Sequence, residues 1–162
     1  MSDQAAEPAH DQAVTNRYVI HYPAHPARTS DPHYRDFDAY RRRTQAQAVC
    51  AVGAEVGDFS ECADAQGAPI PSQPNGGHGL ELHHAHIEFA LENGVDLALL
   101  EHVYPGVSNP DAVGAWVESA ANLQWLCARH HREQSAGVHH LSAADFEAAK
   151  FVRGLAGPAG PA

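Results

Sequence analysis

The stretch NLQWLCARHH, residues 122–131, decides the fold class of this chain together with LELHH at residues 80–84. Apolar and polar residues alternate at the start of both stretches, as they do in short strands with one buried face. The second stretch continues into Cys127 and His130, whose Cys-x-x-His spacing is typical of a metal-binding turn at the start of a helix. The sequence therefore predicts strands at 79–83 and 123–126 and a helix over 128–134.

The rest of the chain predicts an α+β protein with one domain over residues 17–155. Residues 1–16 and 156–162 have the composition of disordered tails. Residues 33–49 contain no Gly or Pro and predict a helix, whereas residues 50–79 are rich in loop formers. Further helical segments are predicted over 87–103, with a break at Asn93-Gly94, from the Asn109-Pro110 cap through Glu118, and over 144–152 after a Ser142 cap.

The bulk composition is that of an ordinary globular protein. The 162 residues are 44% apolar and 19% charged, and no run is long and apolar enough to cross a membrane. The first residues lack the basic and apolar regions of a signal peptide, so a cytoplasmic location is expected. The three cysteines cannot all pair with one another, which in a reducing compartment favours metal ligation or burial as free thiols.

The charge pattern bears on nucleic-acid binding. The net charge is −10, which by itself argues against a nucleic-acid partner. No basic residue lies between positions 44 and 128, so positive charge is concentrated in two segments that folding could bring onto one face. For Arg41–Arg43 an ordinary solvated helix face is an equal alternative. The candidate DNA contacts are Arg129, Arg132, Arg41, Arg42 and Arg43.

Histidine is the compositional anomaly of the chain, with 13 residues. Histidine is the commonest metal ligand and titrates near neutral pH. Only the spacing of the histidines can separate ligands from surface residues. Five histidines outside the two quoted stretches are expected to be structural or exposed rather than catalytic: His78, His86, His102, His139 and His140.

With LELHH followed by NLQWLCARHH, the chain resembles the HNH endonucleases, also called ββα-metal or His-Me finger nucleases, whose pattern is commonly written LEVHH…NLxLLCxxCH. The resemblance covers about residues 50–135. The later stretch GVHHLSAADFEAAKFVRGL is similar to the ends of small HNH proteins encoded by actinobacterial phages. The resemblance implies a ββα-metal centre with a zinc knuckle and flanking helices, in which residues 87–118 form a helical insertion.

The resemblance also implies roles for single residues. His84 matches the general base that activates water, and Asn122 matches the residue that braces the base or binds the metal. His83 and His131 match ligands of a catalytic divalent ion, which could be Mg, Mn, Ni or Zn. Phosphodiester cleavage suits such a set, because neutral imidazole accepts a proton near pH 7 and a divalent ion stabilises charge on the phosphate.

A structural zinc is the second cofactor that the resemblance implies. Cys127 and His130 match the second half of a zinc knuckle, and Cys50 and Cys62 are the candidates for its first half. Eleven residues separate Cys50 from Cys62, where zinc ribbons usually have two to four. The alternative is that both are free buried thiols.

The paired histidines raise a geometric question. Adjacent residues of a helix differ by about 100°, so His130 and His131 are expected to face different metals. Adjacent residues of a strand point to opposite faces, so His83 and His84 reach one site only if the strand ends or bends there.

A shifted register is also open, because HHAHI would allow His86 to take the position of the base. That register puts Ala85 at the ligand position, where it could bind nothing. The register with His83 as ligand and His84 as base is therefore preferred.

The function that these expectations describe is metal-dependent hydrolysis of DNA phosphodiester bonds. The alternative from another class is a non-catalytic, zinc-stabilised module that binds nucleic acid or protein on an HNH scaffold. DNA is the expected partner and a membrane is not. Phage packaging machinery, suggested by the similarity near the end of the chain, and a homodimer partner are further candidates.

Overall fold

The computed structural model describes residues 21–143, 145, 146 and 150. It is a mixed α+β fold around a small antiparallel sheet of β1 (Leu80–His84) and β2 (Leu123–Cys127). The register pairs His83 with Gln124 and His84 with Leu123. Both strands lie within one residue of their predicted bounds. The predicted tails at 1–16 and 156–162 and most of the predicted helix 144–152 lie outside the described residues.

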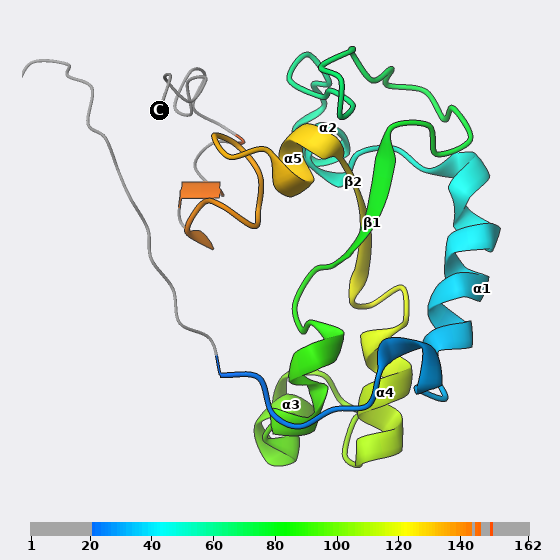
Figure 1. Cartoon of the computed structure of the whole chain (residues 1–162), viewed down its shortest axis with the longest axis vertical. Coiled ribbons are helices and arrows are strands. Elements are labelled where there is room, and N and C mark those ends of the chain that lie inside the picture. The colour runs from blue at the N-terminus through cyan, green and yellow to red at the C-terminus, as the bar shows by residue number, and fades with distance from the viewer. Residues whose placement is uncertain (1–20, 144, 147–149, 151–162) are drawn as a thin grey trace, which may run out of the picture.

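The two strands connect two groups of helices (Figure 1). The first group contains α2 (Ala51–Val56) and α5 (Ala128–Arg132), and the second contains η3 (Phe89–Gly94), α3 (Leu97–Val103) and α4 (Pro110–Val117). The helix α1 (Tyr34–Thr44) runs along one side of the strands and continues into the 3₁₀ turn η2 (Gln45–Gln47). The predicted helix over 33–49 thus ends earlier, and α2 occupies part of the segment predicted as loop.

A buried cluster surrounds the junction of β2 and α5. Leu126 and Cys127 are fully buried there, and Phe146 closes the cluster from the end of the described chain. Gly79 allows the tight entry into β1, because its φ is +72° and an added Cβ would lie 2.3 Å from Cδ1 of Ile70. The cluster consists of Ala48, Cys50, Val52, Cys62, Ile70, Leu80, Leu126, Cys127 and Phe146.

A second cluster forms the core of the helical insertion predicted at 87–118. Asp96 caps α3 by accepting from the amides of Ala98 and Leu99, and Asn109 caps α4 ahead of Pro110, as predicted. The cluster consists of Phe89, Leu100, Val107, Val113, Trp116 and Val117.

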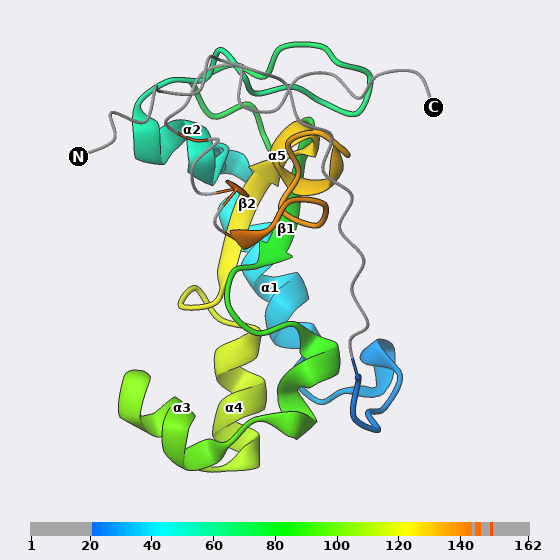
Figure 2. The ribbon, with the colours of Figure 1, turned by 90° about the vertical axis from the view of Figure 1, so that its left-hand side faces the viewer.

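The segment before α1 passes in front of this insertion in Figure 1 and lies to one side of it in Figure 2. It contains the 3₁₀ turn η1 (Arg28–Ser30). The Nδ2 of Asn93 donates to the carbonyl of Ala24 at 2.9 Å, which fastens the segment to η3. Within the described part of the chain, no helix has the length and apolar character needed to span a membrane.

Candidate metal centres

Three thiols and one imidazole meet beneath α5. Nδ1 of His130 lies 3.4 Å from Sγ of Cys50, 3.8 Å from Sγ of Cys62 and 3.2 Å from Sγ of Cys127. All three cysteines are buried and none forms a disulfide. The four ligand atoms lie within 4.8 Å of one another, so the group could hold a metal ion such as zinc. The structure therefore unites Cys50 and Cys62 with the second pair despite their wide spacing.

The ionisation of this group is consistent with a cation site. Hydrogen bonds from the Cys127 and Cys62 thiols hold the pKa of Cys50 well below its usual value, whereas hydrogen bonds with Cys127 and Cys50 raise the pKa of Cys62. Burial would lower the pKa of His130, but its hydrogen bonds to Cys127 and Cys50 outweigh burial and raise it to about 9. Because thiolates packed around one point repel each other, a cation is what would stabilise all of them together.

A second group of ligands contains three histidines on the other side of α5. His83 comes from β1, His131 from α5, and His139 from the segment after α5. Their ligand nitrogens all lie within 4.8 Å of one another, and Nε2 of His131 is 3.0 Å from Nε2 of His139. His83 is buried and His139 is exposed, so the group is open to solvent on one side. His130 and His131 thus serve different groups, as the helical geometry predicts.

The nearby carboxylate of Glu81 orients one ring of this three-histidine group. Glu81 accepts a hydrogen bond from Nδ1 of His131 through one oxygen and from Nε of Arg132 through the other. With its proton held at Nδ1, the neutral His131 ring keeps a lone pair at Nε2, on the side of His139. Burial, followed by repulsion from His131 and His139, lowers the pKa of His83 to about 4 and keeps that ring neutral.

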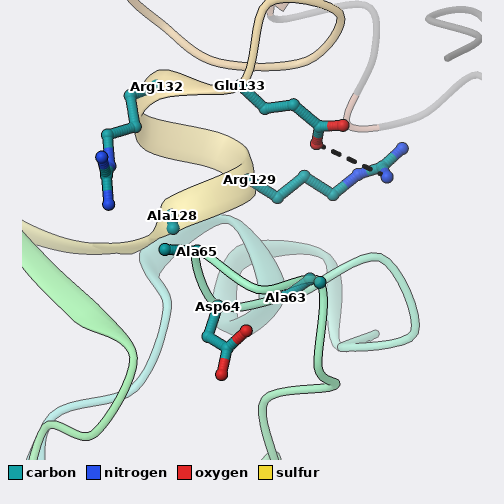
Figure 3. A pocket seen from close by; sticks show the side chains of 8 residues that line it. Ala63, Asp64, Ala65, Ala128, Arg129, Arg132 and Glu133 are labelled. Atoms are coloured by element: carbon teal, nitrogen blue, oxygen red, sulfur yellow. Dashed lines mark ion pairs between the residues drawn. The ribbon is translucent and has the colours of Figure 1, made fainter.

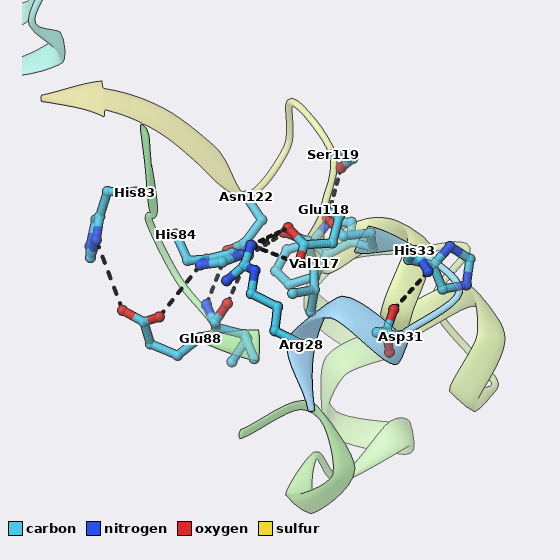
Figure 4. Close-up of polar contacts among 12 residues, drawn as sticks. Arg28, Asp31, His33, His83, His84, Glu88, Val117, Glu118, Ser119 and Asn122 are labelled. Atoms are coloured by element: carbon cyan, nitrogen blue, oxygen red, sulfur yellow. Dashed lines mark hydrogen bonds and ion pairs between the residues drawn. The ribbon is translucent and has the colours of Figure 1, made fainter. Parts of the chain in front are cut away.

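His84 points away from His83 and is held between two carboxylates (Figure 4). Its Nε2 lies 3.0 Å from Oε2 of Glu118, and its Nδ1 lies 3.4 Å from Oε2 of Glu88. Burial of the ring would lower the pKa of His84, but the hydrogen bonds to Glu118 and Glu88 outweigh it and raise the pKa. Because β1 ends at His84, the chain turns there and brings Glu88 back between the two histidines.

The carboxylate of Glu88 faces the rings of both His83 and His84 (Figure 4). Its Oε1 is 3.9 Å from Nδ1 of His83, and its Oε2 faces His84. Burial would raise the pKa of Glu88, but the hydrogen bond from His84 and the charges of both rings lower it. The carboxylate of Glu88 thus lies between His83, the predicted metal ligand, and His84, the predicted base.

Asn122 braces the backbone that follows β1 and contacts no histidine ring in the described contacts. Its Oδ1 accepts from the amides of His86 and Ile87 at 2.9 and 3.0 Å. Its Nδ2 donates to the carbonyls of Ile87 and Val117. The fully buried side chain thereby fixes the loop that carries Glu88. These contacts brace the backbone after β1, and the two roles that the resemblance implied for Asn122, bracing the base or binding the metal, stay predictions.

His86 occupies a different environment from His83 and His84. Its ring stacks against Trp116 with a centroid distance of 6.3 Å and lies 5.6 Å from the ring of Tyr104. Both partners belong to the helical insertion. The ring of His86 therefore packs against residues 104 and 116, and the choice between the two registers stays a prediction.

The arginines predicted to contact DNA are engaged with acidic side chains. Arg41 and Arg42 both pair with Asp38 on α1, and α1 lies on the opposite side of the strands from the segment after α5. Folding thus does not place α1 on the face of His139. The other pairs are Arg129 with Glu61 and Glu133, and Arg132 with Glu81, while Arg43 lies 5.6 Å from the ring of Tyr40.

Arg129 and Arg132 also line a pocket of about 350 Å³ between α5 and the loop at residues 63–67 (Figure 3). Asp64 and Glu133 line the same pocket, so its wall carries both signs of charge. The backbone amide of Arg129 donates to the carbonyl of Ala63, which ties α5 to the loop. The pocket wall is therefore not uniformly basic, as a phosphate-binding surface would be.

Sequence reasoning missed four residues of this region: Glu81, Glu88, Glu118 and His139. Glu81 had a signal, because it lies two residues before His83 and so shares a face of β1 with it. The other three are brought in by turns and by the helical insertion. Comparisons with protein-family models, with curated proteins and with solved structures found no match to this chain.

Proposed function

We propose that this protein is a metal-dependent endonuclease of the HNH type that hydrolyses DNA phosphodiester bonds. The observation that carries the proposal is the convergence of His83, His131 and His139 next to His84, at the point where two strands meet a short helix. Three imidazoles with an open side are typical of a catalytic rather than a structural metal site. The three histidines come from β1, from α5 and from the segment after α5, so the fold itself brings them together.

The residues fit a divalent transition metal. All three ligand atoms are imidazole nitrogens, which suit Zn or Ni, whereas Mg and Mn prefer oxygen ligands. Glu81 supplies the outer hydrogen bond that metal-bound histidines usually make. When bound, the ion would supply positive charge beside the scissile phosphate and its leaving oxygen.

His84 is the general base in this proposal. Glu118 holds Nε2, so Nδ1 is the nitrogen that accepts the proton of the attacking water. Glu88 faces Nδ1 at 3.4 Å, the longer of the two contacts of His84, and its side chain is 39% exposed. Glu88 must therefore turn away from Nδ1 as the water arrives, and Asn122 keeps the loop of Glu88 in place while it does so.

The Cys50, Cys62, Cys127 and His130 group is proposed to hold a structural zinc. Its ligands come from the N-cap of α2, the following loop, the end of β2 and α5. A closed site with four protein ligands is typical of structural zinc, whose binding contributes directly to the free energy of folding. It also fixes α5, and with it His131.

A second candidate function is a non-catalytic binding module on the same scaffold. The observation that favours it is the carboxylate on each ring nitrogen of His84, which leaves neither nitrogen free in this arrangement. The acidic net charge of −10 also favours a partner other than DNA. One experiment separates the two functions.

The test is cleavage of supercoiled plasmid by the zinc-loaded protein with Mg²⁺, Mn²⁺ or Ni²⁺ added. The parent is expected to cut with at least one ion, and His84→Ala is expected to lose about 10²–10⁴-fold in rate, the usual contribution of a general base. Plasmid binding and zinc content should stay unchanged in that variant.

His102→Ala is the matched control, because His102 is an exposed histidine on α3. It should cut like the parent. An active His84→Ala beside an inactive His86→Ala would move the base by two residues. A parent that binds DNA but cuts it with none of the three ions would refute the nuclease proposal and leave the binding module.

A further inference from the structure

A buried carboxylate on α4 connects His84 to the segment before α1 (Figure 4). Glu118, the C-terminal cap residue of α4, is 2% exposed. Its Oε2 lies 3.0 Å from Nε2 of His84, and its Oε1 accepts from NH2 of Arg28 at 3.0 Å. Arg28 thus forms one end of a chain of charged groups that reaches the proposed base.

Arg28 is held in place by aromatic rings as well as by charge. Its guanidinium lies 4.3 Å from the centroid of Phe37 and 5.4 Å from that of Phe89. The ring of His84 stacks on the same Phe37, with a centroid distance of 5.9 Å and an interplanar angle of 27°. Phe37 therefore fixes the separation of the guanidinium and the imidazole, and Glu118 spans the gap between them.

We infer that Glu118 is a positioning residue that fixes the orientation and tautomer of His84, and that Arg28 holds Glu118 for this task. A carboxylate that accepts from Nε2–H leaves the lone pair of a neutral ring at Nδ1, on the side of Glu88 and His83. In this arrangement the buried Glu118 carboxylate orients the His84 base, as the acid of a catalytic triad orients its histidine. The inference deepens the proposed function and rests on it wherever a cleavage rate is the readout.

Fold stability alone accounts poorly for this group. The Glu118 side chain is 1% exposed and that of Arg28 is 33% exposed, so the carboxylate is the charge that folding removes from water. Burial of a charge is expensive, and an apolar side chain of similar volume often stabilises a fold as well or better. The neighbours Phe37, Phe89 and Val117 would pack equally well against apolar side chains. A charged pair directed at one ring nitrogen is better explained by what it does to that ring.

The test compares Glu118→Gln with the parent in three measurements on zinc-loaded protein. An amide can donate to Nε2 as well as accept from it, so the proton is no longer confined to that nitrogen. The plasmid cleavage rate at saturating DNA should fall by at least about 10-fold, towards the ~10⁴-fold loss known for the acid of a catalytic triad. The dissociation constant for DNA should not change.

The NMR signal of the His84 ring proton distinguishes positioning from packing, because loss of packing alone would not change it. In ¹⁵N-labelled parent at pH 8, the Nε2 proton should give a downfield, slowly exchanging NMR signal, as expected for a buried hydrogen bond to a carboxylate. Glu118→Gln should lose or strongly shift that signal. Persistence of the parent signal and the parent rate in Glu118→Gln would overturn the inference.

Arg28 variants test the second half of the inference and guard against a folding defect at Glu118. Arg28→Met should lose cleavage rate at unchanged DNA affinity, and Arg28→Lys should restore part of it. Equal rates for Arg28→Met and the parent would limit positioning to Glu118 and overturn the role of Arg28.

Glu101→Gln is the matched acidic control, because Glu101 also bonds within the insertion, to the amides of Gly106 and Val107, and is remote from His84 in sequence. It should leave both the rate and the His84 signal unchanged. If the parent itself cuts no DNA, the proposed function fails. The NMR comparison still decides whether Glu118 fixes the His84 ring.

Discussion

The carboxylate of Glu81 accepts a hydrogen bond from Nδ1 of His131, and on the far side of the same ring Nε2 faces Nε2 of His139 at 3.0 Å. The two contacts give the ring a defined polarity, with the proton towards Glu81 and the lone pair towards the other histidines. Histidines that bind metals are commonly held in this way by an outer carboxylate. The relationship leads to the first prediction.

Glu81→Gln should weaken metal binding at the three-histidine group by about 10–100-fold, the usual effect of removing an outer partner. Titration of zinc-loaded protein with Co²⁺, followed by visible absorption, measures the affinity. Glu61→Gln is the control, because Glu61 pairs with Arg129 and has no contact with this group among the described ones. Equal affinities for Glu81→Gln and the parent would show that Glu81 does not orient His131.

Purified protein should contain about one tightly bound zinc per chain, and Cys127→Ser should lose it. Because ligation of a structural zinc contributes directly to folding, the melting temperature should fall by more than about 10 °C. Elemental analysis and thermal melting check this, with His78→Ala as a control on an exposed loop. A zinc-free parent that melts like Cys127→Ser would exclude the knuckle.

Arg132 should contribute to DNA binding more than Arg129 does. The Arg132 side chain is 55% exposed, whereas that of Arg129 is 29% exposed and pairs with both Glu61 and Glu133. Arg132→Gln should flatten the dependence of log K on log salt by about 0.9, the value for one phosphate contact, and Arg129→Gln by less. Fluorescence anisotropy across a salt series measures both slopes. An unchanged slope in both variants would place any DNA contact on another face.

Glu92 should make stability fall as the pH rises through its titration range. Burial, followed by repulsion from Asp31, raises the pKa of Glu92 to about 7, well above its ordinary value of 4.5. Between these two pH values the folded chain keeps the Glu92 proton and the unfolded chain has released it. The free energy of unfolding therefore falls from about pH 4.5 and levels off above about pH 7.

Glu92→Gln should remove this penalty and raise stability at pH 8 by an amount on the order of 1 kcal/mol, since solvent screens this half-exposed group. The difference in melting temperature between Glu92→Gln and the parent should be near zero at pH 4.5 and grow to a plateau above pH 7. A difference that is constant across that range would contradict the raised pKa.

Local sequence signals predicted the elements better than the contacts between them. The strands at 80–84 and 123–127 follow from alternation, and the start of α4 follows from Asn109-Pro110, because each signal acts within a few residues. The short helix α2 was missed, since its six residues lie among Gly-rich and Pro-rich loops and its stability comes from packing of Val52 in the core. Periodicity cannot detect an element of that length.

The candidate site residues also fall into those set by local sequence and those set by long-range contacts. Cys127, His130 and His131 are neighbours in sequence, and their separate directions follow from helix geometry. His139 and Glu118 reach the site through a turn and through the end of an inserted helix, and no spacing rule connects them to His83 or His84. Long-range contacts of this kind depend on the whole fold.

His130 and His131 are adjacent residues of the five-residue helix α5, yet each belongs to a different ligand group. Two ions held through one short helix are coupled if binding of the first orders α5, because the ordered helix then presents its other histidine to the second ion. Thermodynamic reciprocity then requires that each ion raise the affinity for its neighbour by the same factor. The zinc knuckle would in that case act as an effector of the site beside it, and zinc occupancy would control how readily the second ion is taken up.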